Sequence, residues 1–230
     1  MRHADPNPLD FELVDGRDVA ALQDPRPAVL VGARSDAGEI CFATVIWVTP
    51  VSHNPAMVAF ALRAKSHTMG IIRATGRFSL AVPPADAEGV RLVEFCGGNT
   101  GRLVDKGAAV AHALVSASPA APSDDGGNAE GGKAETDTAA AARSTFAPAA
   151  PGEAAAEDTG RTDLVPVPLH SYSWEVGVIE SIQEAGDHLL AVGTITRAGT
   201  RAPRDERGQL TPYDSLLCVQ HGAYAAAQRL

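Results

Sequence analysis

The sequence predicts an all-β protein with a few short helices, built as an antiparallel barrel. Short apolar segments recur about 8 to 12 residues apart, and Gly- or Pro-containing turns separate them. The sequence contains no G-x-G-x-x-G fingerprint and no regular alternation of strands with helices, which argues against a Rossmann domain. Together these observations favour strands that pair as hairpins.

Six segments have the composition and the boundaries of strands. Each is rich in aliphatic or aromatic residues and is bounded by turn residues. The predicted strands are Ala28–Gly32, Glu39–Val48, Ala56–Arg63, Arg77–Val82, Tyr172–Ile182 and His188–Arg197. A turn at residues 35–38 (SDAG) joins the first two into a hairpin, and a turn at 184–187 (EAGD) joins the last two.

Two segments are predicted to be helical. In His67–Thr75 the residues Met69, Ile71 and Ile72 would face inward, and Gly76 is a typical helix stop. The second helix is expected at Ala85–Phe95, after the Pro83-Pro84 pair that ends the fourth strand.

A segment of different composition interrupts the barrel pattern. From Ser116 to Asp163 the only large apolar residue is Phe146, and the segment carries nine acidic and three basic residues. Such a stretch cannot bury enough surface to offset its ordering entropy, so we expect a disordered insert. The chain therefore divides into an N-terminal extension (1–24), one domain (25–115 and 164–230) and the insert (116–163).

Charge and cysteine content limit the class of protein. The net charge is −9, which argues against a nucleic-acid binder, and no apolar run is long enough to cross a bilayer. The polar N-terminus lacks a signal-peptide pattern, so we expect a soluble, cytoplasmic protein. Cys41, Cys96 and Cys218 are widely spaced, and the histidines form no ligand motif, so neither a disulfide framework nor a metal site is predicted. Cys96 is expected to be a small buried hydrophobe rather than a nucleophile.

Two neighbouring loops concentrate the polar residues. The first, residues 47–55 (WVTPVSHNP), holds two prolines and is expected to be a rigid loop that presents amides and hydroxyls on one rim. The second, residues 63–68 (RAKSHT), places two cations, hydroxyls and free amides at a helix N-terminus, which is what a phosphate group needs. The alternative is a capped helix, with Ser66 as the N-cap and the cations solvated.

Several short motifs recur in a fixed order outside the insert. They are RPAVLV from Arg26, WVTPVS from Trp47 followed by Asn54-Pro55, Thr68 ahead of a helix, Arg77-Phe78, EFCGG from Glu94 with Val104-Asp105-Lys106, Gly186-Asp187-His188 leading to Val192-Gly193, and the late Gly222 and Tyr224. Their order and spacing resemble the flavin reductase-like, FMN-binding split-barrel family. The resemblance covers nearly all of the chain outside the insert.

The resemblance implies a split β-barrel that forms a homodimer and binds FMN near the dimer interface. By position, the residues that would line the isoalloxazine ring are Thr44, Trp47, Val48, Thr49 and Ser52. The residues that would hold the phosphate are Arg63, Lys65, Ser66 and Thr68. His188 would orient a nicotinamide or stabilise charge on the reduced flavin, or it is simply a polar residue that begins a strand.

Two functions follow from this resemblance. The first is an NAD(P)H-dependent flavin (FMN) reductase, in which the protein positions two rings for hydride transfer. Reduced flavin would then leave for a partner monooxygenase or stay bound. The second is a non-enzymatic electron-transfer protein of flavoredoxin type, which keeps its FMN and exchanges electrons with another redox protein.

Overall fold

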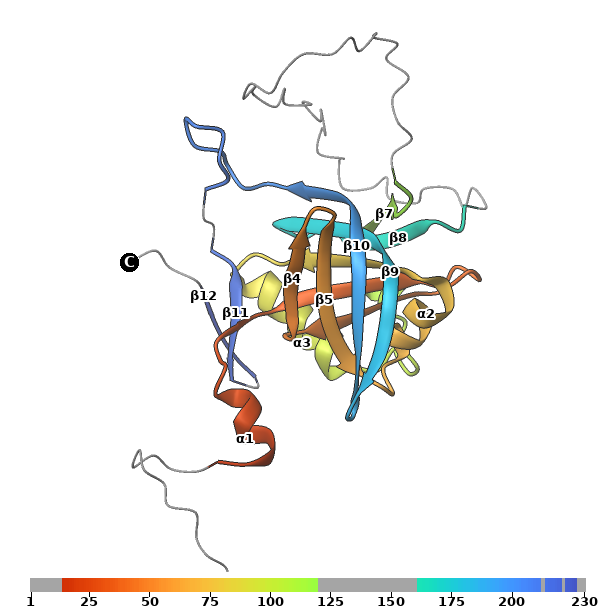
Figure 1. Cartoon of the computed structure of the whole chain (residues 1–230), viewed down its shortest axis with the longest axis horizontal. Helices are drawn as coiled ribbons and strands as arrows, with labels where there is room; N and C mark the ends of the chain where they lie inside the picture. Colours follow the sequence, from red (N-terminus) through yellow and green to blue (C-terminus); the bar gives the residue numbers. More distant parts are fainter. Residues whose placement is uncertain (1–13, 120–160, 212–213, 221, 227–230) are drawn as a thin grey trace, which may run out of the picture.

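Seven strands form the main sheet, and every pairing within it is antiparallel (Figure 1). The computed structural model describes residues 14–119, 161–211, 214–220 and 222–226. The strands are β2 (Val29–Arg34), β3 (Ile40–Val45), β4 (Val48–His53), β5 (Ala56–Arg63), β6 (Arg77–Val82), β9 (Ser173–Ala185) and β10 (His188–Thr200). Their order in the sheet is β3-β2-β6-β9-β10-β5-β4. β3 and β4 follow each other in sequence but occupy opposite edges of the sheet, so the barrel is not closed.

The structure confirms the predicted fold class and several of the predicted elements. β5 and β6 have the predicted bounds, and so does helix α2 (His67–Thr75). The Ser66 hydroxyl caps α2 by accepting a hydrogen bond from the Met69 amide at 3.3 Å, and Gly76 ends it in the left-handed region at φ 68°. Local sequence therefore specifies both ends of α2.

The first polar loop was predicted wrongly. Residues 47–55 are not a loop, because Val48–His53 pairs with β5 as the edge strand β4, and the predicted strand Glu39–Val48 breaks after Val45. The register shifts between Pro50 and Ser52. Proline lacks the amide that an inner strand would need, but an edge strand tolerates it. The outer edge of β4 pairs with no strand in the described part of the chain.

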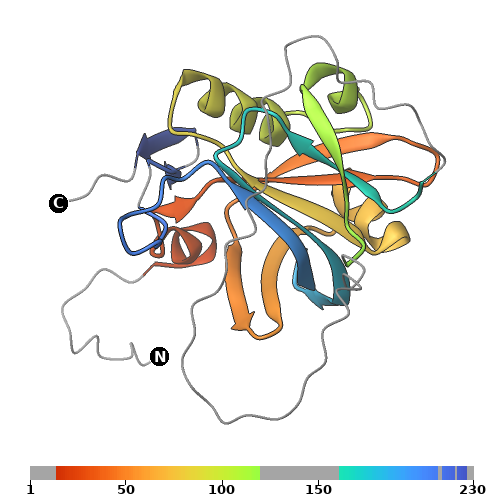
Figure 2. The same cartoon turned by 90° about the horizontal axis from the view of Figure 1, so that it is seen from above.

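Two apolar layers hold the barrel. The interior contains residues from β2, β5, β6, β10 and α2, and the Phe60 and Phe78 ring centroids are 5.2 Å apart there. Gly193 is required beneath Phe78, because a Cβ at this position would lie 2.4 Å from the ring. The second layer lies between the outer face of the sheet and α3 (Ala87–Gly98), with Phe42, Val93 and Cys96 buried. Figure 2 shows α3 on one side of the barrel and the β4–β5 hairpin on the other.

Smaller elements flank the barrel. Helix α3 begins two residues later than predicted, because the Asp86 side chain caps it by accepting from the Gly89 amide at 2.7 Å. A short helix α4 (Lys106–Ala109) follows. A separate sheet joins β1 (Arg26–Pro27), β11 (Leu216–Gln220) and β12 (Ala223–Ala226), and α1 (Gly16–Ala21) precedes it within the predicted N-terminal extension (Figure 1). No helix of the described residues is both long and apolar enough to span a membrane.

A two-stranded ribbon joins the two ends of the predicted insert. β7 (His112–Ser116) pairs with β8 (Leu164–Pro168), so Ser116 belongs to the folded part and not to the insert. The Ser116 hydroxyl donates to the Asp163 carboxylate at 2.5 Å, and Arg161 binds the same carboxylate. These hydrogen bonds, with Arg161 the larger cause, hold the pKa of Asp163 well below its usual range. Residues 120–160 lie outside the described residues, so the prediction of disorder there is not tested.

Replacing residues 120–160 with a short Gly/Ser linker should leave the barrel intact. The ribbon already brings residues 117 and 163 into hydrogen-bond contact at 2.9 Å. We expect the melting temperature to change by less than about 3 °C, because loop-closure entropy varies slowly with length. In the same background, Asp163→Ala should lower it, because it leaves Ser116 and Arg161 without their acceptor. A loss of solubility in the linker variant would show that the deleted segment covers the barrel.

Candidate functional site

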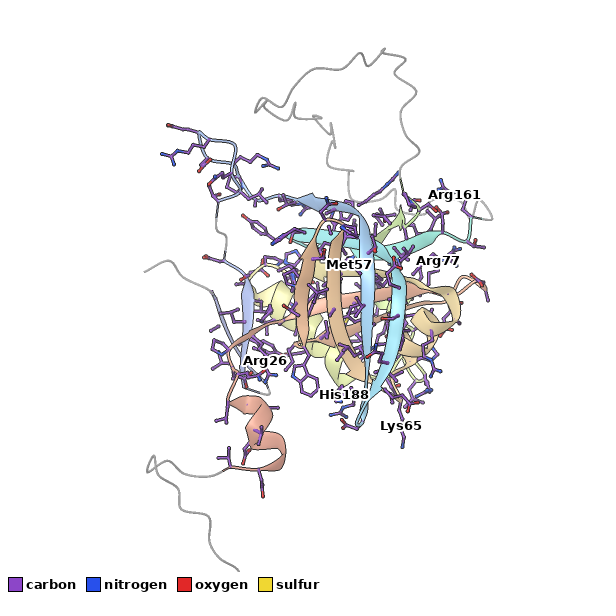
Figure 3. The ribbon with its side chains drawn as sticks, in the orientation of Figure 1. Arg26, Met57, Lys65, Arg77, Arg161 and His188 are labelled. Carbon is purple, nitrogen blue, oxygen red and sulfur yellow. The ribbon has the colours of Figure 1, made fainter. Side chains whose placement is uncertain are left out.

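The register between β5 and β10 brings two predicted site segments to one end of the barrel. His188, the first residue of β10, lies opposite Arg63, the last residue of β5. The Ala64 amide donates to the Asp187 carbonyl at 3.0 Å, which joins the loop after β5 to the β9–β10 turn. Figure 3 shows His188 and Lys65 at this end and Met57, from the tip of the β4–β5 hairpin, toward the other.

An aromatic pair lies beside this loop. The Trp47 and His188 rings are 4.5 Å apart at an interplanar angle of 40°, and Trp47 remains 37% exposed. The Trp47 carbonyl accepts from the Ala61 amide at 2.9 Å, which fixes the start of β4 against β5. The Arg26 guanidinium lies 5.9 Å from the Trp47 ring. The exposed indole thus has both an imidazole and a cation near its ring.

Asp187 orients the imidazole. His188 Nδ1 lies 2.6 Å from the Asp187 carboxylate. This hydrogen bond lowers the pKa of Asp187, as does the positive charge of a protonated His188. Since a carboxylate accepts, Nδ1 carries a proton, and Nε2 is left to meet a ligand.

The loop of residues 63–68 has the character of an anion site. Arg63 and Lys65 are exposed, and Ser66 begins α2, whose positive end faces the loop. The first-turn amides of His67 and Thr68 have no partner within the helix. Two cations and helix-terminal amides therefore meet at one place, and the Glu39 carboxylate lies beside it, 2.6 Å from His67 Nε2.

Thr68 differs from its predicted role. Its side chain is only 2% exposed, and its hydroxyl donates to the Cys41 sulfur at 3.2 Å inside the barrel. The hydroxyl is therefore used in the core, and only the Thr68 amide is left for a ligand at the helix end.

The remaining predicted residues are dispersed. Thr44 lies under α3, where its hydroxyl donates to the Val93 carbonyl at 2.6 Å. Val48 packs against the barrel interior, and Thr49 is exposed on β4. Ser52 pairs with Met57 near the hairpin tip. These residues follow Trp47 along one strand, with Val48 toward the interior and Thr49 toward solvent.

A buried lysine at the start of α4 joins this helix to β3 and to the end of α3. Lys106 is 3% exposed, and its ammonium donates to the carbonyls of Phe42 at 2.8 Å and Cys96 at 2.7 Å. Desolvation lowers the pKa of Lys106 and raises the pKa of Cys96 to about 12. The Cys96 thiol thus stays protonated, as expected for a structural cysteine.

Comparison with known proteins identifies the family and the fold of the chain. Residues 23–227 match the family described as "Flavin reductase like domain". The chain belongs to this family. Among solved structures it is similar to the FMN-binding protein from Thermus thermophilus (21% identity, 94% of each chain, TM-score 0.65). It is also similar to the flavoredoxin from Methanosarcina acetivorans (19% identity, 90% of this chain and 87% of that one, TM-score 0.61). A third is the styrene monooxygenase flavin reductase from Pseudomonas putida S12 (15% identity, 93% and 98%, TM-score 0.53).

The flavin reductase-like chain has further polar residues at this end that sequence reasoning missed. Arg102 donates to the Lys65 carbonyl at 3.0 Å, and Glu39 lies 2.6 Å from His67 Nε2. Arg102 follows a Gly-Asn-Thr-Gly stretch far from residues 63–68 in sequence, so only the folded chain shows their contact. Arg26 was noted within a motif, but its position over Trp47 could not be predicted.

Two hollows are found on the surface of the described residues. One, of about 510 Å³, lies between the β2–β3 turn and residues 101–108 and borders the Arg102–Lys65 contact. The other, of about 340 Å³, lies beside α3 and His170. Neither hollow is lined by Trp47 or by a residue of β4.

Proposed function

We propose that this protein is an NAD(P)H-dependent flavin reductase-type oxidoreductase that binds FMN along β4, with its phosphate at residues 63–68. The observation that carries the proposal is the placement of the cationic loop at the α2 N-terminus beside the Trp47–His188 pair. Arg63, Lys65 and the amides after Ser66 would hold the phosphate, and Trp47, Val48, Thr49 and Ser52 would line the ring. The Thr44 and Thr68 side chains are already hydrogen-bonded elsewhere.

The residues present fit an FMN of this kind. A phosphate dianion meets two cations and the positive end of a helix of nine residues, with no carboxylate within residues 63–68. Two carboxylates border the loop, and each is engaged by a histidine: Asp187 by His188 and Glu39 by His67. The partly exposed Trp47 and the unpaired edge of β4 offer a flat surface and main-chain groups to a planar ring.

The bound flavin would supply the redox chemistry, by accepting a hydride from nicotinamide C4. The protein residues would bind the flavin and orient it. Arg63 and Lys65 fix the phosphate end, β4 fixes the ring, and Asp187 holds the His188 imidazole so that Nε2 can donate to a ligand when the ring is protonated. No acid or base with a strongly shifted pKa is needed for hydride transfer.

The similarity to a flavoredoxin favours a second candidate function. In that case the same site would hold FMN permanently and exchange electrons with another redox protein. In the first case, a partner monooxygenase is the natural acceptor, as the name of the Pseudomonas putida relative suggests for that protein. A cytoplasmic location is proposed with either function.

Bleaching of the flavin by a nicotinamide separates the two functions. In oxygen-free solution, adding NADH or NADPH to the FMN-bound protein should abolish the yellow absorbance of the flavin. The absorbance should be lost again each time more flavin is added. His188→Ala should slow bleaching by about tenfold or more through lost positioning, with FMN affinity changed by less than about threefold. His170→Ala, an exposed histidine beside α3, is the control. Bound FMN that neither nucleotide reduces would contradict the reductase and support the electron-transfer protein.

Removing the cations should weaken FMN far more than riboflavin. Arg63→Ala combined with Lys65→Ala should raise the Kd for FMN by about two powers of ten, because charge-assisted hydrogen bonds to the phosphate are lost. Riboflavin has no phosphate, and its Kd should change by less than about threefold. Arg73→Ala, near the other end of α2, is the matched control. Equal losses for both flavins would show that the loop supports the barrel without binding phosphate.

A homodimer is proposed in which β4 lies near the subunit boundary. Val51 on β4 is 51% exposed, and the edge of β4 is unpaired among the described strands. Sedimentation at micromolar concentration should give twice the mass of one chain. Val51→Asp should shift the equilibrium toward monomer and weaken flavin binding, whereas Leu210→Asp, at a site 52% exposed, should do neither. A flavin-bound monomer in the unmodified protein would refute this arrangement.

A further inference from the structure

Arg26 connects the Trp47 ring to the segment that precedes the barrel. Its Nε donates to the Asp24 carboxylate at 2.7 Å, and its Nη2 donates to the Ala20 carbonyl in the last turn of α1, also at 2.7 Å. Figure 3 shows Arg26 beside α1. Its guanidinium carbon lies 5.9 Å from the centroid of the Trp47 ring. One side chain therefore reaches α1, the segment after it and the exposed indole.

The Arg26 guanidinium is fixed through both its main chain and its side chain. Arg26 begins β1, where it pairs with Cys218 of β11. The Arg26 and Asp24 side chains are 14% and 15% exposed, and two charges attract more strongly where water is largely excluded. α1 has no basic residue in its own last turn, and Arg26 supplies the cation that the carbonyl end of a helix favours. The guanidinium is thus oriented before any ligand binds.

The orientation of the Trp47 ring depends on this cation. Trp47 lies where the chain crosses from β3 to β4, at opposite edges of the sheet. Its carbonyl is held by the Ala61 amide, but that bond does not orient the indole. The indole itself contacts the His188 imidazole and the Arg26 guanidinium. Tryptophan attracts a cation to its ring more strongly than the other aromatic side chains do, so Arg26 helps to hold a ring that is partly open to solvent.

We propose that Arg26 is a positioning residue of the flavin site, which orients the Trp47 indole for contact with the isoalloxazine ring and makes α1 part of that support. The proposal rests on the proposed function, because the flavin ring must lie beside Trp47. Arg26 would act through the indole, whereas Arg63 and Lys65 would act on the phosphate directly. The two sets of cations therefore differ in which flavins they affect.

Titration of FMN and riboflavin against the full-length protein tests this role. Arg26→Ala should raise the Kd of both flavins by the same factor, about fivefold, because the ring loses an oriented partner while the phosphate site stays intact. Arg26→Lys keeps the charge but cannot bond Asp24 and the Ala20 carbonyl with one planar group, so it should restore only part of this loss. The matched control is Arg91→Ala, at an exposed arginine paired with Glu88 on α3, which should leave both Kd values within about twofold.

Two further variants test the links from α1 to the flavin. In a Trp47→Ala background, Arg26→Ala should change neither Kd by more than about twofold, because the indole through which it acts is gone. Val19→Pro, at a position of α1 that is 50% exposed, breaks the helix that presents the Ala20 carbonyl. It should weaken both flavins as Arg26→Ala does, whereas Val19→Ala should not.

The indole N–H resonance of Trp47 gives a measurement that needs no flavin. It is assigned by its loss in Trp47→Ala, and Trp174 provides the second tryptophan resonance of the chain. In Arg26→Ala the Trp47 resonance should move toward the position of a solvent-exposed indole, while the Trp174 resonance stays in place. A Trp47 resonance that does not move would overturn the positioning role, whether or not flavin binds.

The flavin titrations distinguish failure of this role from failure of the flavin site. A larger loss for FMN than for riboflavin in Arg26→Ala would overturn the positioning role and make Arg26 a ligand of the phosphate. An equal loss that persists in the Trp47→Ala background would overturn it in favour of a general loss of folding stability. Flavin binding that Arg26→Ala leaves unchanged would overturn the role of Arg26 alone, whereas an unmodified protein that binds neither flavin would overturn the proposed function as well.

Discussion

The antiparallel register of β5 with β10 is the constraint on which the candidate site depends. It places His188 opposite Arg63, and the adjoining hydrogen bond from Ala64 to Asp187 joins the two loops that follow. Because side chains alternate across a strand, a slip of one residue would turn the imidazole to the other face and separate it from Trp47. The interior fixes this register, since Phe78 packs against Gly177 and Gly193, where any side chain would collide.

The open edge of the barrel is the second determinant. β3 and β4 do not pair, although only two residues separate them. β3 is covered by α3 and α4, with Lys106 and Thr68 satisfying buried polar groups on either side of it. Among the described residues no helix covers β4, and most of its residues, with Trp47 before them, are exposed. One edge of the sheet is thus covered by helices and the other is not.

Local sequence was sufficient for elements whose signals are local. β5, β6 and α2 have the predicted bounds, because their turn, cap and stop residues lie within a few positions of the ends. The strand character of residues 48–53 depends on pairing with β5, whereas the two prolines in the segment 47–55 are typical of a loop. The ribbon of β7 and β8 could not be predicted either, because the hydrogen-bonded residues Ser116 and Asp163 are 47 positions apart in the sequence.

The same difference between local and long-range signals applies to the candidate site. Sequence placed Arg63, Lys65 and Ser66 at a helix start, and the structure has them there. It gave Thr68 a ligand role from its hydroxyl, but helical periodicity turns that side chain inward, toward Cys41. Arg102 and Glu39 come from distant segments and join the loop only through tertiary packing.

The ring contact between Trp47 and His188 also gives the protein an optical probe of its own site. The chain has two tryptophans, and the second, Trp174, packs among the apolar layers that flank the barrel. An indole 4.5 Å from an imidazole is sensitive to the protonation of that ring and to any chromophore that settles beside it. We expect emission from Trp47 to respond to events at His188, against a background from Trp174.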